Sequence, residues 1–118
     1  MKNSHDKLKY SLFIGRWQPW HEGHRWLIDQ RLHEGKNVCV AIRDVAITPR
    51  EPWTAEEVKE NIEKELSDLI KWERVKVIII PDIESVNYGR GVGYEIIEHF
   101  PPEDVKKISA TEIRSKMK

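Results

Sequence analysis

Cysteine, net charge and long apolar runs are what this chain of 118 residues has least of. Its single cysteine, Cys39, cannot form a disulfide within the chain, and its place in the apolar run 38–42 predicts a buried, unreactive thiol. Twenty basic and twenty acidic side chains cancel, so no general positive field attracts nucleic acid or a membrane surface. We therefore expect neither of these as a partner, and any anion site must be local.

Targeting segments are also lacking. No apolar run approaches the roughly 20 residues that cross a bilayer, and the polar residues 1–7 lack the apolar core of a signal peptide. We expect a protein of the reducing cytoplasm. The length fits one domain, residues 1–118, with 1–7 as a flexible tail.

The first half of the chain has the pattern of a β-α-β unit. Residues Lys9–Ile14 are rich in β-branched and aromatic side chains, which predicts a strand. A helix is expected over Glu22–Glu34, ended by Gly35, with a second strand at Val38–Ile42. Their apolar residues, 12–14 and 38–42, are continuous rather than alternating, which is typical of parallel strands covered on both faces.

A second unit follows. Thr54 and the glutamate three residues later form a capping box, and a helical stripe continues from there: Val58, Ile62, Leu66, Leu69 and Ile70. The strongest strand signal is Val75–Ile80. After it we expect a glycine-rich loop at 87–93, a short amphipathic helix around 94–100 and a capped helix start at 109–112. The predicted fold class is α/β: a Rossmann-like, three-layer α/β/α domain whose mostly parallel sheet has four to five strands.

The ten residues from Gly15 to His24 join the first strand to the first helix, which is where open α/β sheets bind ligands. The helix start offers unpaired N–H groups and a partial positive charge to phosphate oxygens. Gly23 permits close approach of the backbone. The imidazoles of His21 and His24, three residues apart, can converge on one anion. Such donors suit the charge that develops on an α-phosphate.

The same stretch has other interpretations. A zinc metalloprotease helix has two residues between its His-Glu pair and the second histidine, whereas here only Gly23 intervenes, so that spacing excludes a metalloprotease. An ordinary loop and a structural metal site are the remaining alternatives from the residues alone.

Two motifs resemble one known family. The sequence Gly-Arg-Trp-Gln-Pro-Trp-His-Glu-Gly-His at 15–24 is similar to the signature of the cytidylyltransferase-like, or HxGH, nucleotidyltransferase superfamily. The sequence Ile-Ser-Ala-Thr-Glu-Ile-Arg at 108–114 resembles the same family's C-terminal element. The resemblance covers residues 9–115. Ala110 departs from the family pattern, which often has a second serine there, and so lacks one hydroxyl of that pattern.

The resemblance implies a nucleotidyltransferase in which Mg²⁺ bridges the phosphates of a nucleoside triphosphate and needs no dedicated protein ligands. The implied catalytic residues are His21, His24 and Arg114. The implied nucleotide-binding residues are Gly15, Arg16, Trp17, Gly23, Ser109 and Thr111. The residues of the second motif also indicate phosphate binding without the resemblance, because hydroxyls, helix-start amides and a guanidinium together suit β- and γ-phosphates. A plain helix cap is the alternative there.

Charged residues elsewhere are candidates for binding the acceptor. Arg43 and Asp44 follow the second strand, and Arg90 lies in the glycine-rich loop, whose glycines do not have the dinucleotide-binding spacing. We expect these three residues to hold the acceptor's acidic group or the nucleotide, with a mobile surface loop as the alternative for Arg90.

Five tryptophans are many for this length. We expect Trp17 and Trp20 to stack on a base or close over the ligand. Trp26 and Trp72 are expected in the core or on a helix face, and Trp53 is expected to act as a hydrophobic staple beside the Thr54 cap.

The base and the acceptor are left open by the sequence. Transfer of CMP from CTP to a phosphate or phosphonate is favoured slightly over adenylyl transfer from ATP to an acceptor such as nicotinamide mononucleotide or pantetheine phosphate. Compared with adenylyltransferases of this family, the chain is shortened between Ile80 and Ile108. A nucleotide-binding module without catalysis is the alternative from another class, although such a binder does not need both His21 and His24. A homodimer is plausible from the shortness of the chain.

Overall fold

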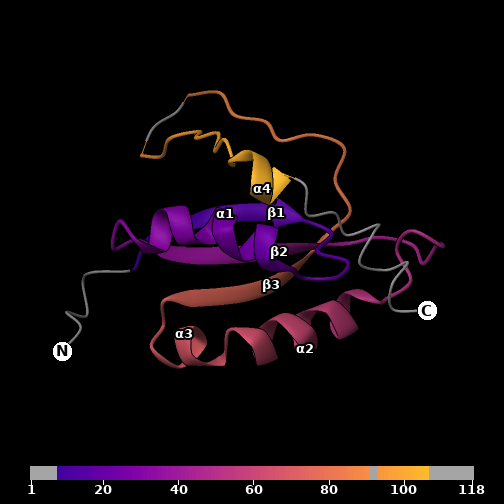
Figure 1. Ribbon diagram of the computed structural model, residues 1–118. Helices are drawn as coiled ribbons and strands as arrows, with labels where there is room; N and C mark the ends of the chain where they lie inside the picture. The colour runs from indigo at the N-terminus through magenta and orange to yellow at the C-terminus, as the bar shows by residue number, and fades with distance from the viewer. Residues whose placement is uncertain (1–7, 91–92, 107–118) are drawn as a thin grey trace.

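The computed structural model describes residues 8–90 and 93–106, which form a parallel sheet with helical crossovers (Figure 1). The strands are β1 (Tyr10–Gly15), β2 (Asn37–Asp44) and β3 (Val75–Pro81), in the order β1-β2-β3. Both pairings are parallel. The α/β, Rossmann-like fold class is confirmed. In the described part of the chain the sheet has three strands, fewer than the four to five expected.

The crossover helices are α1 (Glu22–Leu32) and α2 (Ala55–Glu65). Phe13, Val40 and Val77 are neighbours in register on three strands, so their side chains share one face of the sheet. The same buried cluster contains residues of both helices, namely Ile28, Leu32, Val58 and Ile62. Two right-handed crossovers that step in the same direction put both helices on one face. The opposite face carries Leu12, which is 58% exposed, so the described crossover helices form one layer.

The local signals for α1 and α2 were read correctly. The Thr54 hydroxyl accepts a hydrogen bond from the Glu57 N–H at 3.1 Å, and the Glu57 carboxylate accepts one from the Thr54 N–H at 3.0 Å. Gly35 follows α1 with a φ of +76°, a conformation that glycine adopts without strain. Capping chemistry is local, and a sequence is sufficient to reveal it.

The single helix expected to run on to Ile70 is interrupted. It ends at Glu65, and after Leu66 a short helix α3 (Ser67–Lys71) follows. Leu66 is buried with φ and ψ outside the helical region, which redirects the chain toward β3. The expectation of a packed Trp72 was wrong, because its side chain lies beyond this turn and the residue is 72% exposed.

The segment after β3 differs most from expectation. Residues 94–102 form no helix, so the amphipathic helix expected at 94–100 was wrong, and only a short α4 (Glu103–Lys106) follows. Ile96, Ile97 and Phe100 are exposed, and without an apolar surface to bury them a short helix has no net stabilisation. In Figure 1 this segment arches past the outer edge of β1. Together with β1 it lines a cavity of about 1030 Å³.

Cys39 is buried in β2 as predicted, and burial raises the pKa of its thiol. None of the helices found within residues 8–90 and 93–106 is long and apolar enough to cross a membrane. The tail expected at residues 1–7 lies outside the described residues.

Candidate nucleotide site

The candidate site lies at the carboxyl edge of the sheet. Because the three strands are parallel, β1, β2 and β3 all end at this edge, and the loops that begin at Arg16, Val45 and Asp82 start side by side. Ligands of open α/β sheets bind at this kind of edge. The first loop leads into α1, so it also carries a helix N-terminus.

The two histidines form a reciprocal cap at the start of α1. His21 is the N-cap residue, and its Nδ1 accepts a hydrogen bond from the Gly23 N–H at 3.0 Å. The His21 N–H in turn donates to Nδ1 of His24 at 3.3 Å. Their rings are stacked, with centroids 3.6 Å apart and planes 21° from parallel. The structure thus brings the predicted pair together, and it does so through backbone hydrogen bonds.

The same hydrogen bonds set the chemistry of both rings. An Nδ1 that accepts a hydrogen bond carries no proton, so the proton of each neutral ring is on Nε2. Burial, and secondarily the neighbouring His21, lower the pKa of His24 from 6.5 to about 3, and burial lowers the pKa of His21. At neutral pH the two side chains are therefore uncharged and each has one N–H to donate.

Trp17 lies beneath this pair. Its ring meets the His24 ring edge-on at 4.8 Å, and its Nε1–H donates to the Ala41 carbonyl of β2 at 3.0 Å. The residue is only 5% exposed and has a φ of 55°, an uncommon conformation for a bulky side chain. Burial argues against the expected stacking of Trp17 on a base. Trp20, which is half-buried and 5.4 Å from the His24 ring, remains exposed enough for that role.

Gly15 has a steric reason to be glycine. A Cβ at this position would lie 2.9 Å from Cε2 of Trp17, which is closer than real Cβ contacts. The end of β1 and the buried indole therefore fit together only without a side chain at residue 15.

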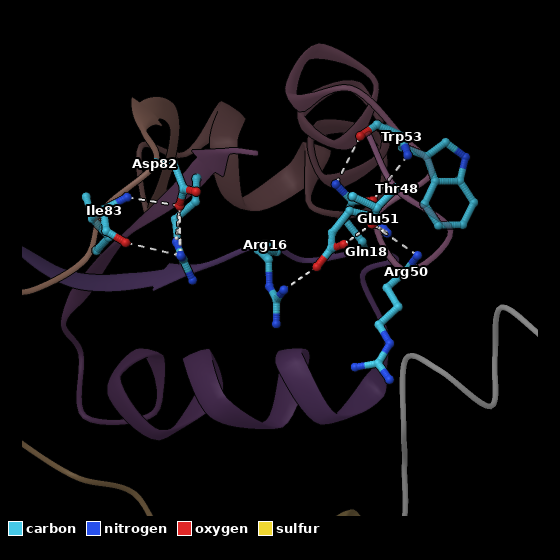
Figure 2. Close-up of polar contacts among 9 residues, drawn as sticks. Arg16, Gln18, Thr48, Arg50, Glu51, Trp53, Asp82 and Ile83 are labelled. Carbon is cyan, nitrogen blue, oxygen red and sulfur yellow. Dashed lines mark hydrogen bonds and ion pairs between the residues drawn. The ribbon is translucent and has the colours of Figure 1, made fainter. Parts of the chain in front are cut away.

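Two sets of contacts join the first loop to the loop that follows β2 (Figure 2). The Gln18 side chain donates to the Trp53 carbonyl at 3.0 Å and accepts from the Trp53 N–H at 3.1 Å. Arg16 forms an ion pair with Glu51. Sequence reasoning placed Arg16 in the site but missed Glu51 as its partner, and it missed the bonds between Gln18 and Trp53. The partners are 35 residues apart, and no local pattern reveals a contact of that separation.

The arginine expected to bind the acceptor is engaged within the chain. Nε of Arg43 lies 2.9 Å and Nη2 lies 2.7 Å from Oδ1 of Asp82, and Nη2 also donates to the Ile83 carbonyl at 3.2 Å. In Figure 2 Asp82 and Ile83 lie apart from the pair of Arg16 and Glu51. Asp82 carries no recognisable motif, although its place directly after β3 puts it at the same edge of the sheet. Its carboxylate offsets the charge of Arg43 that an acidic acceptor would meet.

The other predicted site residues are not brought together to the same extent. Asp44 ends β2 and is exposed. Arg90 is exposed, and within residues 8–90 and 93–106 no hydrogen bond or ion pair joins it to the predicted site residues. Ser109, Thr111 and Arg114 lie outside the described residues.

No group of three or more histidine, cysteine, aspartate or glutamate side chains that could hold a metal ion occurs in the part of the chain that the structure describes. The described site offers hydrogen-bond donors, which match phosphate oxygens.

Comparisons with known proteins point in one direction. No known family profile matches the chain. Over 79 residues the chain is 34% identical to the nicotinamide-nucleotide adenylyltransferase of Methanospirillum hungatei JF-1, a match that covers 65% of this chain and 42% of the relative. The match therefore spans less than half of the relative's length. At the coarse level, this is a similarity to a nucleotidyltransferase.

Proposed function

We propose that this chain forms the nucleotide-binding core of an adenylyltransferase. It would transfer AMP from ATP to a small molecule that carries a phosphate group, with nicotinamide mononucleotide as the first candidate acceptor. The observation that carries the proposal is the pair of neutral, stacked imidazoles fixed at the start of α1 at the carboxyl edge of the sheet. The 34% identity to a nicotinamide-nucleotide adenylyltransferase supports the same reaction class.

The proposed reaction is an in-line displacement. An oxygen of the acceptor phosphate attacks the α-phosphorus of ATP, a new P–O bond forms, and the bond from the α-phosphorus to the bridging oxygen of the β-phosphate breaks. Pyrophosphate leaves with that electron pair. The acceptor phosphate is already ionised at neutral pH, so no general base is required, and catalysis consists of positioning and charge stabilisation.

His21 and His24 would donate their Nε2–H groups to the oxygens of the α-phosphate. Both Nδ1 atoms already accept backbone hydrogen bonds, so neither ring has to reorient when negative charge develops. Arg16 and the amides at the start of α1 would contact the phosphates. Ser109, Thr111 and Arg114 are assigned to the leaving pyrophosphate on the strength of the sequence motif, and Arg43, Asp44 and Arg90 stay candidates for the acceptor.

Mg²⁺ would neutralise part of the charge on the triphosphate and on the leaving pyrophosphate. The site would contribute oriented N–H donors to some phosphate oxygens, and the cation would bind others.

Adenylyl transfer is preferred here to cytidylyl transfer, which the sequence alone favoured. The preference rests on the likeness to an adenylyltransferase.

The test is a pyrophosphate-release assay with ATP, CTP, GTP and UTP, each with Mg²⁺, against nicotinamide mononucleotide, pantetheine phosphate and glycerol phosphate. We expect release with ATP and nicotinamide mononucleotide. His24→Ala should reduce the rate about a hundred- to a thousand-fold. Pyrophosphate release with CTP alone would favour cytidylyl transfer instead. Thermal stabilisation by a triphosphate without release from any pair would favour a binding module, and neither effect with any triphosphate would reject nucleotide binding.

A further inference from the structure

The loop after β2 holds a buried carboxylate against the loop after β1. The Glu51 side chain is 11% exposed and is paired with Nη1 of Arg16, whose side chain is 53% exposed. A buried charge is costly unless it is paired and hydrogen-bonded, so the stability of this arrangement depends on the guanidinium staying in place. In Figure 2 a dashed line joins the Arg16 guanidinium to the Glu51 carboxylate.

Glu51 itself is firmly held. The backbones of Thr48 and Glu51 exchange two hydrogen bonds, of 3.0 and 3.1 Å, and the Glu51 N–H also reaches the Thr48 hydroxyl at 3.0 Å. The Thr48 hydroxyl donates to the second carboxylate oxygen of Glu51. The nearby bonds between Gln18 and Trp53 tie the same two loops together again. The carboxylate is thus a fixed reference point rather than a mobile surface group.

Arg16 keeps binding capacity when it is paired in this way. A guanidinium has five N–H donors, and among residues 8–90 and 93–106 its hydrogen-bonding partner is Glu51, through Nη1. The remaining donors belong to a side chain that is half open to solvent, at the edge of the sheet that also carries the histidine pair. An arginine whose conformation is fixed in advance loses less entropy on binding an anion than a free one.

We propose that Glu51 is a positioning residue that holds the Arg16 guanidinium ready for the phosphates of the bound nucleotide. This inference rests on the proposed function, and it adds a residue that makes no contact with the substrate itself. The two opposing effects of Glu51 differ in sign. As a negative charge near a polyanion it weakens triphosphate binding, whereas as a fixed anchor for Arg16 it strengthens binding. We propose that the anchor effect is the larger one.

The experiment measures KM for ATP and kcat by pyrophosphate release, together with the Kd of Mg·ATP by calorimetry, for the wild type, Glu51→Ala and Glu51→Gln. We expect Glu51→Ala to raise KM and Kd about ten- to a hundred-fold, as loss of a hydrogen bond to a charged group typically does. Glu51→Gln can still accept from Arg16, and should recover most of this loss. Glu63→Ala, an exposed glutamate of α2, is the matched control and should stay within two-fold of the wild type.

The double variant Arg16→Ala/Glu51→Ala separates positioning from a merely structural role. If Glu51 acts through Arg16, the double variant binds ATP no more weakly than Arg16→Ala alone. Multiplied losses, or tighter ATP binding by Glu51→Ala, would overturn the inference while the proposed function stands. A wild type without turnover for any triphosphate and acceptor would overturn the proposed function, and with it this inference.

Discussion

His21 and His24 together cap the start of α1. Nδ1 of His21 accepts the Gly23 N–H, and Nδ1 of His24 accepts the N–H of His21. The arrangement resembles a capping box in which imidazoles take the place of the usual hydroxyl and carboxylate. Because Nδ1 of each ring is used for this purpose, Nε2 is left as the donor. One pair of side chains therefore begins the helix and supplies the donors of the candidate site.

Replacing either histidine should reduce activity more than stability. We expect His21→Ala and His24→Ala each to lower the rate of pyrophosphate release about a hundred- to a thousand-fold, because each removes a donor aimed at developing charge. The loss of one cap bond should destabilise the fold by only about 1 kcal/mol. Steady-state kinetics and urea unfolding on the same preparations measure the two effects.

His33→Ala is the matched control for these variants, since His33 is exposed at the other end of the same helix. It should leave the rate unchanged. Near-normal turnover in His24→Ala would remove this residue from the proposed mechanism.

The lowered pKa of His24 predicts a dependence of stability on pH. The unfolded chain takes up a proton near pH 6.5, whereas the folded protein does so only near pH 3, so the unfolded state binds more protons between these values. Stability should thus be highest above pH 6.5 and fall as the pH decreases toward 3. The contribution of His24 amounts to about 2 kcal/mol between pH 7.5 and pH 5.

His24→Gln should flatten this part of the profile, because glutamine does not titrate. Urea unfolding at pH 7.5, 6 and 5 for the wild type, His24→Gln and His33→Gln tests the effect. Equal slopes in all three proteins would mean that His24 is not kept neutral by its surroundings.

Local signals in the sequence were sufficient to predict the strands and helices that position the site. The apolar runs gave the strands, and the Thr54 cap and Gly35 marked helix ends that the structure has. The spacing of His21 and His24 placed two imidazoles near each other at a helix start. These features depend on residues within one turn or one strand of each other, where the physical constraint is local.

The features that sequence reasoning missed depend on distant partners. In the sequence, Glu51 has no feature that distinguishes it from other loop glutamates. Its contact with Arg16 exists only because β1 and β2 pair and bring their loops together. The sequence places Trp17 in a loop where an aromatic side chain could contact a ligand. Its bond from Nε1–H to the Ala41 carbonyl depends on the position of β2, which the local sequence does not show. The expected helix at 94–100 failed because helical periodicity stabilises a helix only where an apolar surface exists to bury it.

Trp17→Phe should destabilise the protein by about 1–3 kcal/mol, since it removes the bond to the Ala41 carbonyl and part of a buried ring. Trp72→Phe is the control, because that residue is 72% exposed, and it should change stability by less than about 0.5 kcal/mol. Thermal and urea unfolding followed by circular dichroism compare the two. Equal effects would contradict the structural role of the Trp17 indole.

The contact between Gly15 and Trp17 gives the last prediction. In Gly15→Ala the added methyl group would overlap the Trp17 ring, which burial and the bond to Ala41 hold in place. Relief of this overlap requires a shift of the ring or of the end of β1, at a cost of about 1–3 kcal/mol. Because the ring also contacts the His24 ring, the shift should lower the rate of pyrophosphate release as well.

Gly89→Ala, where a Cβ meets no atom within 4 Å, should leave both stability and rate unchanged. Urea unfolding and kinetics of the two variants decide the matter: a Gly15→Ala protein as stable and active as Gly89→Ala would mean that the indole is free to move, and that the site does not depend on its position.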